Sequence, residues 1–126
     1  MSHAAVITGC EGLALSDWEK AFFRDLNPWG FILFARNVEN PEQLRALCAD
    51  MRDAVGRDAM ITIDQEGGRV QRLRGPIWRE WLPPLDQVAQ AGPERAARSM
   101  YLRSLLIGRE HLALGIDGNC APCADI

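Results

Sequence analysis

Short apolar segments alternate with amphipathic segments along the whole chain, and this alternation constrains the fold more than any other feature. Residues 30–34 read Gly-Phe-Ile-Leu-Phe, a fully apolar run that is typical of a strand covered on both faces. Residues 4–8, 60–63 and 116–121 are predicted to form three further strands. Because strands that alternate with helices form parallel βα units, the sequence predicts an α/β fold.

Helix capping signals mark the bounds of the first two helices. Ser16 and Glu19 form a capping box, in which the hydroxyl and the carboxylate accept hydrogen bonds from backbone N–H groups at a helix start. This helix is predicted to end at Asn27, before a proline. The second helix is predicted to follow Asn40 and to end at Gly56. The apolar face of the first helix is formed by Trp18, Phe22, Phe23 and Leu26.

A third helix is predicted over residues 93–114. Its apolar positions are Met100, Leu105, Ile107 and Leu112. The connection at residues 65–92 is far longer than a usual βα loop, and long loops in compact domains are often functional. Trp78 and Trp81 favour an ordered, packed loop. Repeats and linkers are absent from the sequence, so we expect residues 1–126 to form a single domain.

The composition argues against several classes of partner. The chain has 126 residues, of which 48% are hydrophobic and 25% charged, as in soluble globular proteins. Its net charge of −3 gives no basic surface for nucleic acid or a membrane. No apolar run approaches the roughly 18 residues that span a bilayer, and the first residues do not resemble an export signal. We therefore expect a cytoplasmic protein without nucleic-acid or membrane partners.

The cysteines and histidines do not form a recognisable metal site. Cys120 and Cys123 form a C-x-x-C pair, but a zinc site needs further ligands that His3 and His111 do not supply. A redox C-x-x-C pair usually opens a helix, whereas this one lies in a predicted strand and its exit, so we interpret the cysteines as small buried residues of a reducing compartment. His111 falls in the last turn of the third predicted helix, where a positive or polar group complements the helix dipole.

The motif that says most about function follows the third predicted strand, at residues 61–74. If the strand continued, Asp64 and Glu66 would point to one face with their Cα atoms roughly 6.5 Å apart. A close pair of carboxylates suits retaining glycoside hydrolysis, with one as nucleophile and one as acid. In the alternative interpretation, Glu66 pairs with a nearby arginine while Asp64 alone meets a ligand. The spacing favours the second interpretation without excluding the first.

Several arginines lie near these carboxylates. Arg69, Arg72 and Arg74 carry planar donor groups that can bind anions or sugar oxygens, although an arginine run is more often a solvated surface. Arg36 and Asn37, which follow the second predicted strand, would reach the same end of the sheet. The adjacent glycine pair allows a sharp turn. Since no phosphate-binding glycine motif is present, nucleotide binding is disfavoured.

The chain resembles bacterial β-N-acetylhexosaminidases of glycoside hydrolase family three, and the resemblance covers nearly its whole length. Residues 63–72, Ile-Asp-Gln-Glu-Gly-Gly-Arg-Val-Gln-Arg, match the family signature almost letter for letter. Residues 30–37, Gly-Phe-Ile-Leu-Phe-Ala-Arg-Asn, resemble the family's second strand and its exit. Residues 115–122, Gly-Ile-Asp-Gly-Asn-Cys-Ala-Pro, resemble its fourth strand.

The resemblance implies a (β/α)₈ TIM barrel, of which this chain supplies the first part, about half. It also implies a retaining enzyme that removes terminal N-acetylglucosamine from peptidoglycan fragments in the cytoplasm. By motif match, Asp64 accepts hydrogen bonds from sugar hydroxyls and Arg72 assists. Glu66, Arg69 and Arg36 are expected to support them. No cofactor and no metal are implied.

The resemblance places the family's catalytic groups beyond this chain. Members carry a His/Asp acid–base pair and a nucleophilic aspartate further along, whereas this sequence ends at Ile126. We therefore expect a truncated N-terminal part that is inactive alone. The alternative is a non-catalytic sugar-binding or interaction module. The outermost strands of a partial barrel expose unpaired edges, so edge-to-edge self-association is a further expectation.

Overall fold

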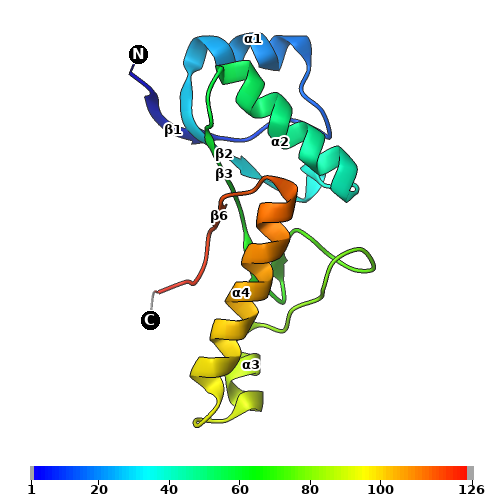
Figure 1. The fold of residues 1–126 in the computed structure, drawn as a ribbon, viewed down its shortest axis with the longest axis vertical. Helices are drawn as coiled ribbons and strands as arrows, with labels where there is room; N and C mark the ends of the chain where they lie inside the picture. Colours follow the sequence, from blue (N-terminus) through cyan, green and yellow to red (C-terminus); the bar gives the residue numbers. More distant parts are fainter. Residues whose placement is uncertain (1, 125–126) are drawn as a thin grey trace.

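A four-stranded parallel sheet forms the centre of the computed structural model, which describes residues 2–124 (Figure 1). The strands, in sheet order, are β1 (Ala4–Thr8), β2 (Pro28–Leu33), β3 (Met60–Ile63) and β6 (Gly118–Asn119). Sheet order follows chain order, so each connection leads to the neighbouring strand. This arrangement confirms the predicted α/β fold of consecutive parallel βα units.

The register of β2 and β3 brings their carboxyl ends to the same level. Gly30 lies opposite Met60, and Leu33 lies opposite Ile63. Glycine is required for this close approach, because a Cβ atom at position 30 would lie 2.8 Å from the Met60 carbonyl oxygen. The residues that follow the two strands therefore leave the sheet side by side.

Helix α1 (Asp17–Leu26) begins at the predicted capping box. The Glu19 backbone N–H donates to the Ser16 hydroxyl at 3.2 Å, and the Ser16 N–H donates to the Glu19 carboxylate at 2.9 Å. The buried Glu19 carboxylate also accepts the Glu11 N–H. Burial alone would raise the pKa of Glu19, but the hydrogen bonds from Ser16 and Glu11 outweigh it and lower that pKa. The helix ends before Asn27, as predicted.

Helix α2 (Pro41–Val55) also has its predicted bounds. The Asn40 side chain accepts a hydrogen bond from the Gln43 backbone N–H at 2.9 Å. At the other end Gly56 adopts a left-handed conformation, with φ of 65°. Figure 1 shows α1 and α2 side by side over the strands.

The hydrophobic core lies between the helices and one face of the sheet. Phe31 and Leu33 of β2 and Ile61 and Ile63 of β3 are fully buried. The helical side of this cluster consists of Phe23, Leu44, Leu47, Met51 and Leu114. Side chains between the buried strand positions point to the other face, where Ile32 remains partly exposed. The prediction that β2 is covered on both faces holds at Phe31 and Leu33, whereas the coverage at Ile32 is partial.

The long connection after β3 is ordered, as predicted, but it contains more secondary structure than the sequence indicates. It holds an antiparallel hairpin of β4 (Gln65–Gly67) and β5 (Val70–Gln71), followed by helix α3 (Pro84–Ala91). Trp78 packs against the core. The sequence analysis missed α3 because adjacent prolines suggest a loop, although proline fits the first turn of a helix well.

Helix α4 (Ala96–Leu114) begins three residues later than predicted, and it projects with α3 away from the sheet (Figure 1). Of its apolar positions, Leu105 and Leu112 are exposed, whereas Ile107 is buried. Arg103 and His111 of this helix are buried as well. The fourth strand is also shorter than predicted, because only Gly118 and Asn119 pair with β3.

His111 is buried near the end of α4, with 3% of its surface exposed. Burial lowers the pKa of His111 from 6.5 to about 4, so the imidazole is neutral at pH 7. The sequence analysis allowed a positive group here, and burial excludes that state. Among the described residues, its Nε2 atom has no hydrogen-bond partner.

His111 should make the chain acid-sensitive. The unfolded chain takes up a proton near pH 6.5, whereas the folded chain takes it up only near pH 4, so stability falls over this range. The shift corresponds to about 3 kcal/mol. We predict that His111→Leu removes most of this loss, measured by chemical denaturation between pH 7 and pH 4. His3→Gln is the control and should behave as wild type. Equal pH dependence in wild type and His111→Leu would contradict the assignment.

Candidate functional site

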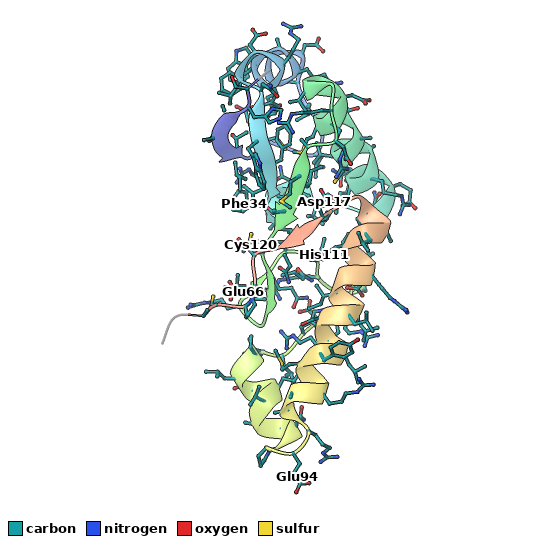
Figure 2. All side chains as sticks on the ribbon, turned by 60° about the vertical axis from the view of Figure 1, so that its left-hand side comes forward. Phe34, Glu66, Glu94, His111, Asp117 and Cys120 are labelled. Atoms are coloured by element: carbon teal, nitrogen blue, oxygen red, sulfur yellow. The ribbon has the colours of Figure 1, made fainter. Side chains whose placement is uncertain are left out.

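Polar and aromatic side chains follow three of the strands at the carboxyl edge of the sheet. Phe34 lies directly after β2, Asp64 directly after β3, and Cys120 directly after β6. Figure 2 shows Phe34, Glu66 and Cys120 gathered where the strands end. In folds built from parallel βα units, this edge is where ligands bind.

Asp64 and Arg72 form an ion pair at this edge. Arg72 Nη2 donates to Asp64 Oδ2 at 2.7 Å, and the two side chains keep 25% and 20% of their surfaces exposed. The pair is thus accessible to a ligand but mostly surrounded by protein. Among the described residues, the buried Arg72 Nε atom has no hydrogen-bond partner. A charge-assisted hydrogen bond of this length fixes the orientation of the carboxylate.

Phe34 connects this ion pair to the exit of β2. The guanidinium carbon of Arg36 lies 4.7 Å from the centre of the Phe34 ring, and that of Arg72 lies 5.8 Å from it. Arg36 also donates to the Cys10 carbonyl at 3.0 Å. Arg36 therefore reaches the same end of the sheet as Asp64, as predicted.

Asn37, at the end of the short 3₁₀ helix η1 (Ala35–Asn37), is buried and has a structural role. Its amide group donates to the carbonyls of Cys10 and Gly12, and its side-chain oxygen accepts the Phe34 N–H. These bonds fasten the exit of β1 to the exit of β2.

Gln65 joins the segments that carry Asp64 and Arg72. Its fully buried side-chain oxygen accepts the backbone N–H groups of Arg72 and Leu73, both at 3.0 Å. Its side-chain nitrogen donates to the Leu73 carbonyl. The Asn119 amide then bonds both backbone groups of Gln65, at 2.8 and 3.0 Å. The sequence analysis did not single out Gln65 or Asn119, because their importance depends on contacts across several strands.

Arg103 holds the hairpin from the side of α4. Its buried guanidinium donates to the carbonyls of Glu66 and Leu82 and to the Gln87 side chain. Desolvation lowers the pKa of Arg103, and the carbonyl oxygens compensate for the lost water. Gly67 leaves the space for this contact, since a Cβ atom there would collide with Arg103 and with the Leu82 carbonyl.

The remaining predicted site residues lie apart from the ion pair. Glu66 accepts a hydrogen bond from the Cys123 thiol at 3.2 Å, so the suggested pairing of Glu66 with an arginine is wrong. Arg69 is exposed at the tip of the hairpin. Arg74 bonds exposed Glu80, as expected for a solvated arginine.

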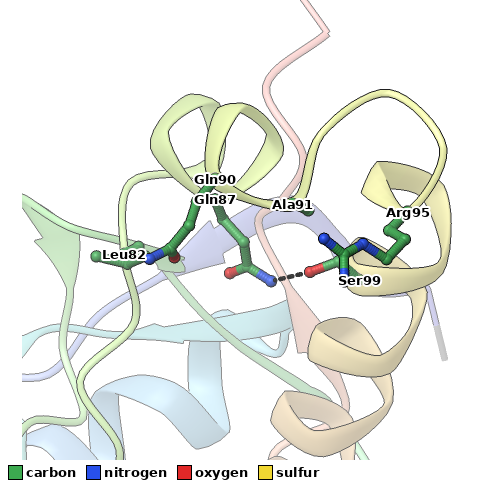
Figure 3. A pocket seen from close by; sticks show the side chains of 6 residues that line it. All are labelled: Leu82, Gln87, Gln90, Ala91, Arg95 and Ser99. Atoms are coloured by element: carbon green, nitrogen blue, oxygen red, sulfur yellow. Dashed lines mark hydrogen bonds between the residues drawn. The ribbon is translucent and has the colours of Figure 1, made fainter.

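Two hollows are lined by neither Asp64 nor Arg72. The first, of about 360 Å³, lies between α3 and α4 and is bridged by the Gln87–Ser99 hydrogen bond of 2.9 Å (Figure 3). Its lining is Leu82, Gln87, Gln90, Ala91, Arg95 and Ser99. The second, of about 790 Å³, lies between α4 and the segment after β6, beside His111.

Two kinds of feature are absent from residues 2–124. No group of three or more His, Cys, Asp or Glu side chains in this range is placed to hold a metal ion. Across the same residues, no helix has the length and apolar character needed to cross a membrane.

The parallel βα units, with polar side chains at the carboxyl ends of the strands, define a chain of the TIM-barrel-like α/β class. The family described as "Glycosyl hydrolase family 3 N terminal domain" matches residues 10–126, and the chain belongs to this family. Curated relatives named beta-hexosaminidase include that of Alkalilimnicola ehrlichii, 37% identical over 96% of this chain. That of Pseudomonas aeruginosa is 37% identical over 91% of this chain.

Solved structures agree with this membership. Native NagZ from Neisseria gonorrhoeae superimposes with a TM-score of 0.83 and 30% identity, covering 95% of this chain and 36% of NagZ. The same protein has been solved in complex with N-trifluoroacetyl-D-glucosamine. A family 3 β-N-acetylglucosaminidase from Paenibacillus gives a TM-score of 0.80 at 32% identity, covering 92% of this chain and 22% of that enzyme. These likenesses confirm a TIM-barrel-like fold for the part that the chain represents.

The chain spans about a third of the length of its curated relatives. It covers 35% of the Alkalilimnicola protein and 33% of the Pseudomonas protein. The activity, substrates and partners of a whole enzyme are therefore proposals for this chain.

Gly67→Ala should disrupt the hairpin that carries the site. Its φ of 102° disfavours any side chain, and the added methyl group would meet Arg103. We expect a loss of about 2 kcal/mol or more in the free energy of unfolding. Gly108→Ala is the matched control, because position 108 lies in α4 with open space around it, and alanine should stabilise that helix by up to about 1 kcal/mol. Equal stability of both variants in chemical denaturation would refute the tight packing at Gly67.

Proposed function

We propose that this chain supplies part of the sugar-binding site of a retaining β-N-acetylhexosaminidase. The observation that carries the proposal is the partly exposed Asp64–Arg72 ion pair at the carboxyl edge of the parallel sheet. Membership of glycoside hydrolase family 3 and the glucosamine derivative bound by the Neisseria relative support a terminal N-acetylglucosamine as ligand. The finer proposal is that the sugar comes from peptidoglycan fragments in the cytoplasm.

In this proposal Asp64 accepts hydrogen bonds from two sugar hydroxyls. Arg72 holds one carboxylate oxygen, which leaves the group oriented before the ligand arrives. Such bonds tighten when the sugar ring flattens toward an oxocarbenium ion, so they favour the transition state over the ground state. Arg36, Glu66 and Arg69 are proposed to support Asp64 and Arg72. For Arg36, the observation behind this role is its stacking on Phe34.

Residues 1–126 are proposed to act as one partial barrel domain that binds sugar without hydrolysing it. Retaining hydrolysis needs a nucleophile and an acid–base group about 5 Å apart. Arg72 bonds one oxygen of Asp64, and the Cys123 thiol bonds Glu66; in this proposal neither carboxylate performs these tasks. Turnover of a chromogenic N-acetylglucosaminide by the pure 126-residue chain would contradict this part of the proposal.

Calorimetric titration with N-acetylglucosamine tests the site. Asp64→Ala should weaken binding about 10- to 100-fold, because hydrogen bonds to a charged group contribute roughly 1.5–3 kcal/mol. Asp25→Ala, at an exposed position on α1, is the matched control and should bind as wild type. Circular dichroism checks that both variants fold. Equal affinity of Asp64→Ala and Asp25→Ala would contradict the assignment of Asp64 to sugar binding. Absence of binding by the wild type would contradict the proposal that this chain binds sugar.

Self-association of the chain is a second proposal, supported by the two edges of the sheet. β1 and β6 are its outermost strands, and Ile7 on β1 has 46% of its surface exposed. The strands of a parallel sheet are usually buried on both faces. An outermost strand with exposed apolar side chains therefore favours pairing with a second copy of the chain. Two copies related by a twofold axis can place β1 of each beside β6 of the other.

Light scattering coupled to size exclusion measures this association. We expect Ile7→Lys to shift the wild-type dimer toward monomer, since an edge lysine opposes strand pairing. Leu85→Lys is the control, because Leu85 on α3 is 81% exposed and remote from both edges, and it should leave the dimer intact. A wild-type chain that is monomeric throughout the concentration range would exclude the proposal.

A further inference from the structure

The C-x-x-C pair has no part in the proposed sugar binding, and its surroundings differ from the predicted ones. Cys10 and Cys48 are buried, as expected, and burial raises the pKa of each thiol to about 11. Cys120 and Cys123 are exposed, so the interpretation of all four cysteines as buried residues is wrong. Two exposed thiols three residues apart require a separate explanation.

Cys120 lies at the rim of the Asp64 site. Its backbone N–H donates to the Ile63 carbonyl at 2.9 Å, which fixes its position after β6. Cys120 directly follows Asn119, whose amide bonds both backbone groups of Gln65, so Cys120 lies beside the segment that carries Asp64. Partial desolvation and the negative charges of Asp64 and Glu66 raise the pKa of this thiol, against the opposing effect of Thr62.

Cys123 lies at the same rim and faces the next carboxylate. Its thiol donates to Glu66 Oε2 at 3.2 Å. Figure 2 shows Glu66 near Cys120, where the chain leaves β6. Glu66 is itself held in place through its backbone carbonyl by Arg103. Both thiols therefore lie next to the short segment that carries Asp64 and Glu66. Two residues separate the two cysteines in the chain.

We propose that Cys120 and Cys123 are a redox-sensitive thiol pair, which a low-molecular-weight disulfide converts to an intramolecular disulfide at the rim of this site. One thiolate attacks a sulfur of the reagent, whose S–S bond breaks, and the released thiolate takes up a proton. The second cysteine, as its thiolate, attacks the protein sulfur of the mixed disulfide, and the second reagent thiolate leaves. The two protein thiols are oxidised, and the reagent disulfide is reduced to two thiols.

The position of the pair explains why it reacts and why the others do not. Exposure gives the reagent access to Cys120 and Cys123, whereas burial protects Cys10 and Cys48. Closure of the disulfide removes the S–H group that bonds Glu66 and the S–H group of Cys120, whose backbone is bonded to Ile63 next to Asp64. An effect on sugar binding would rest on the proposed function, but formation of the disulfide does not.

Mass spectrometry of the full chain in glutathione redox buffers tests the inference. Both cysteines lie in the tryptic peptide of residues 110–126, which contains no internal lysine or arginine. As the buffer becomes more oxidising, this peptide should lose the mass of two hydrogen atoms, and dithiothreitol should restore it. The peptides that carry Cys10 and Cys48 should stay reduced in the folded chain.

Single substitutions give the matched controls. Cys120→Ser and Cys123→Ser should each abolish the loss of two hydrogens and trap a glutathione adduct on the remaining thiol. Cys10→Ser and Cys48→Ser should keep the loss. The inference is overturned if peptide 110–126 stays reduced, if wild type stops at the glutathione adduct, or if Cys120 or Cys123 links to Cys10, to Cys48 or to a second chain. None of these readouts requires the chain to bind sugar.

Discussion

The buried side chain of Gln65 is the contact on which the arrangement of the site depends. It accepts the backbone N–H groups of Arg72 and Leu73, while its own backbone is held by Asn119. Three segments, after β3, around β5 and in β6, are thereby fixed relative to one another. Gln65 directly follows Asp64 in the chain, and its side chain bonds the Arg72 backbone. This connection brings Asp64 and Arg72 together in their 2.7 Å ion pair. A satisfied buried polar network of this kind favours one conformation over its alternatives.

The hairpin is also restrained from outside. Arg103 reaches from α4 to the carbonyls of Glu66 and Leu82, and Gly67 leaves room for its guanidinium. A buried cation held by carbonyl oxygens depends on all of those contacts, since a lost partner leaves a desolvated charge uncompensated. The site is therefore preorganised by α4 and by β6 together. Preorganisation lowers the entropy that ligand binding must overcome.

The sequence predicts those features that depend on local patterns. The bounds of α1 and α2 follow from capping residues, and β1 and β3 follow from short apolar runs. Helix α3 and the exposed face of α4 were missed, because packing partners rather than local preference decide them. The motif at residues 61–74 identifies Asp64 and Arg72 as neighbours in sequence. Asp64 and Arg72 come into contact because the chain turns back through the hairpin of β4 and β5. The spacing of the glycines does not by itself determine this turn.

Other errors have one physical cause. Glu66, Cys120 and Cys123 were all assigned environments that the tertiary structure does not provide. Burial and contacts over long sequence distances set the protonation and the partners of such side chains, and neither is visible in spacing. Membership of glycoside hydrolase family 3 and the superposition on its solved members support the assignment of fold and family. That assignment does not depend on the environments of these side chains.

The central claim is that Asp64 and Arg72 meet a sugar together at the strand ends. Side-chain NMR during titration with N-acetylglucosamine measures this most directly, through the carboxyl carbon of Asp64 and the Nε–H signal of Arg72. Both signals should shift along one saturating curve, because ligand contact with the carboxylate changes the hydrogen bond that joins them. Saturating shifts elsewhere in the chain, with both of these signals unchanged, would contradict the account.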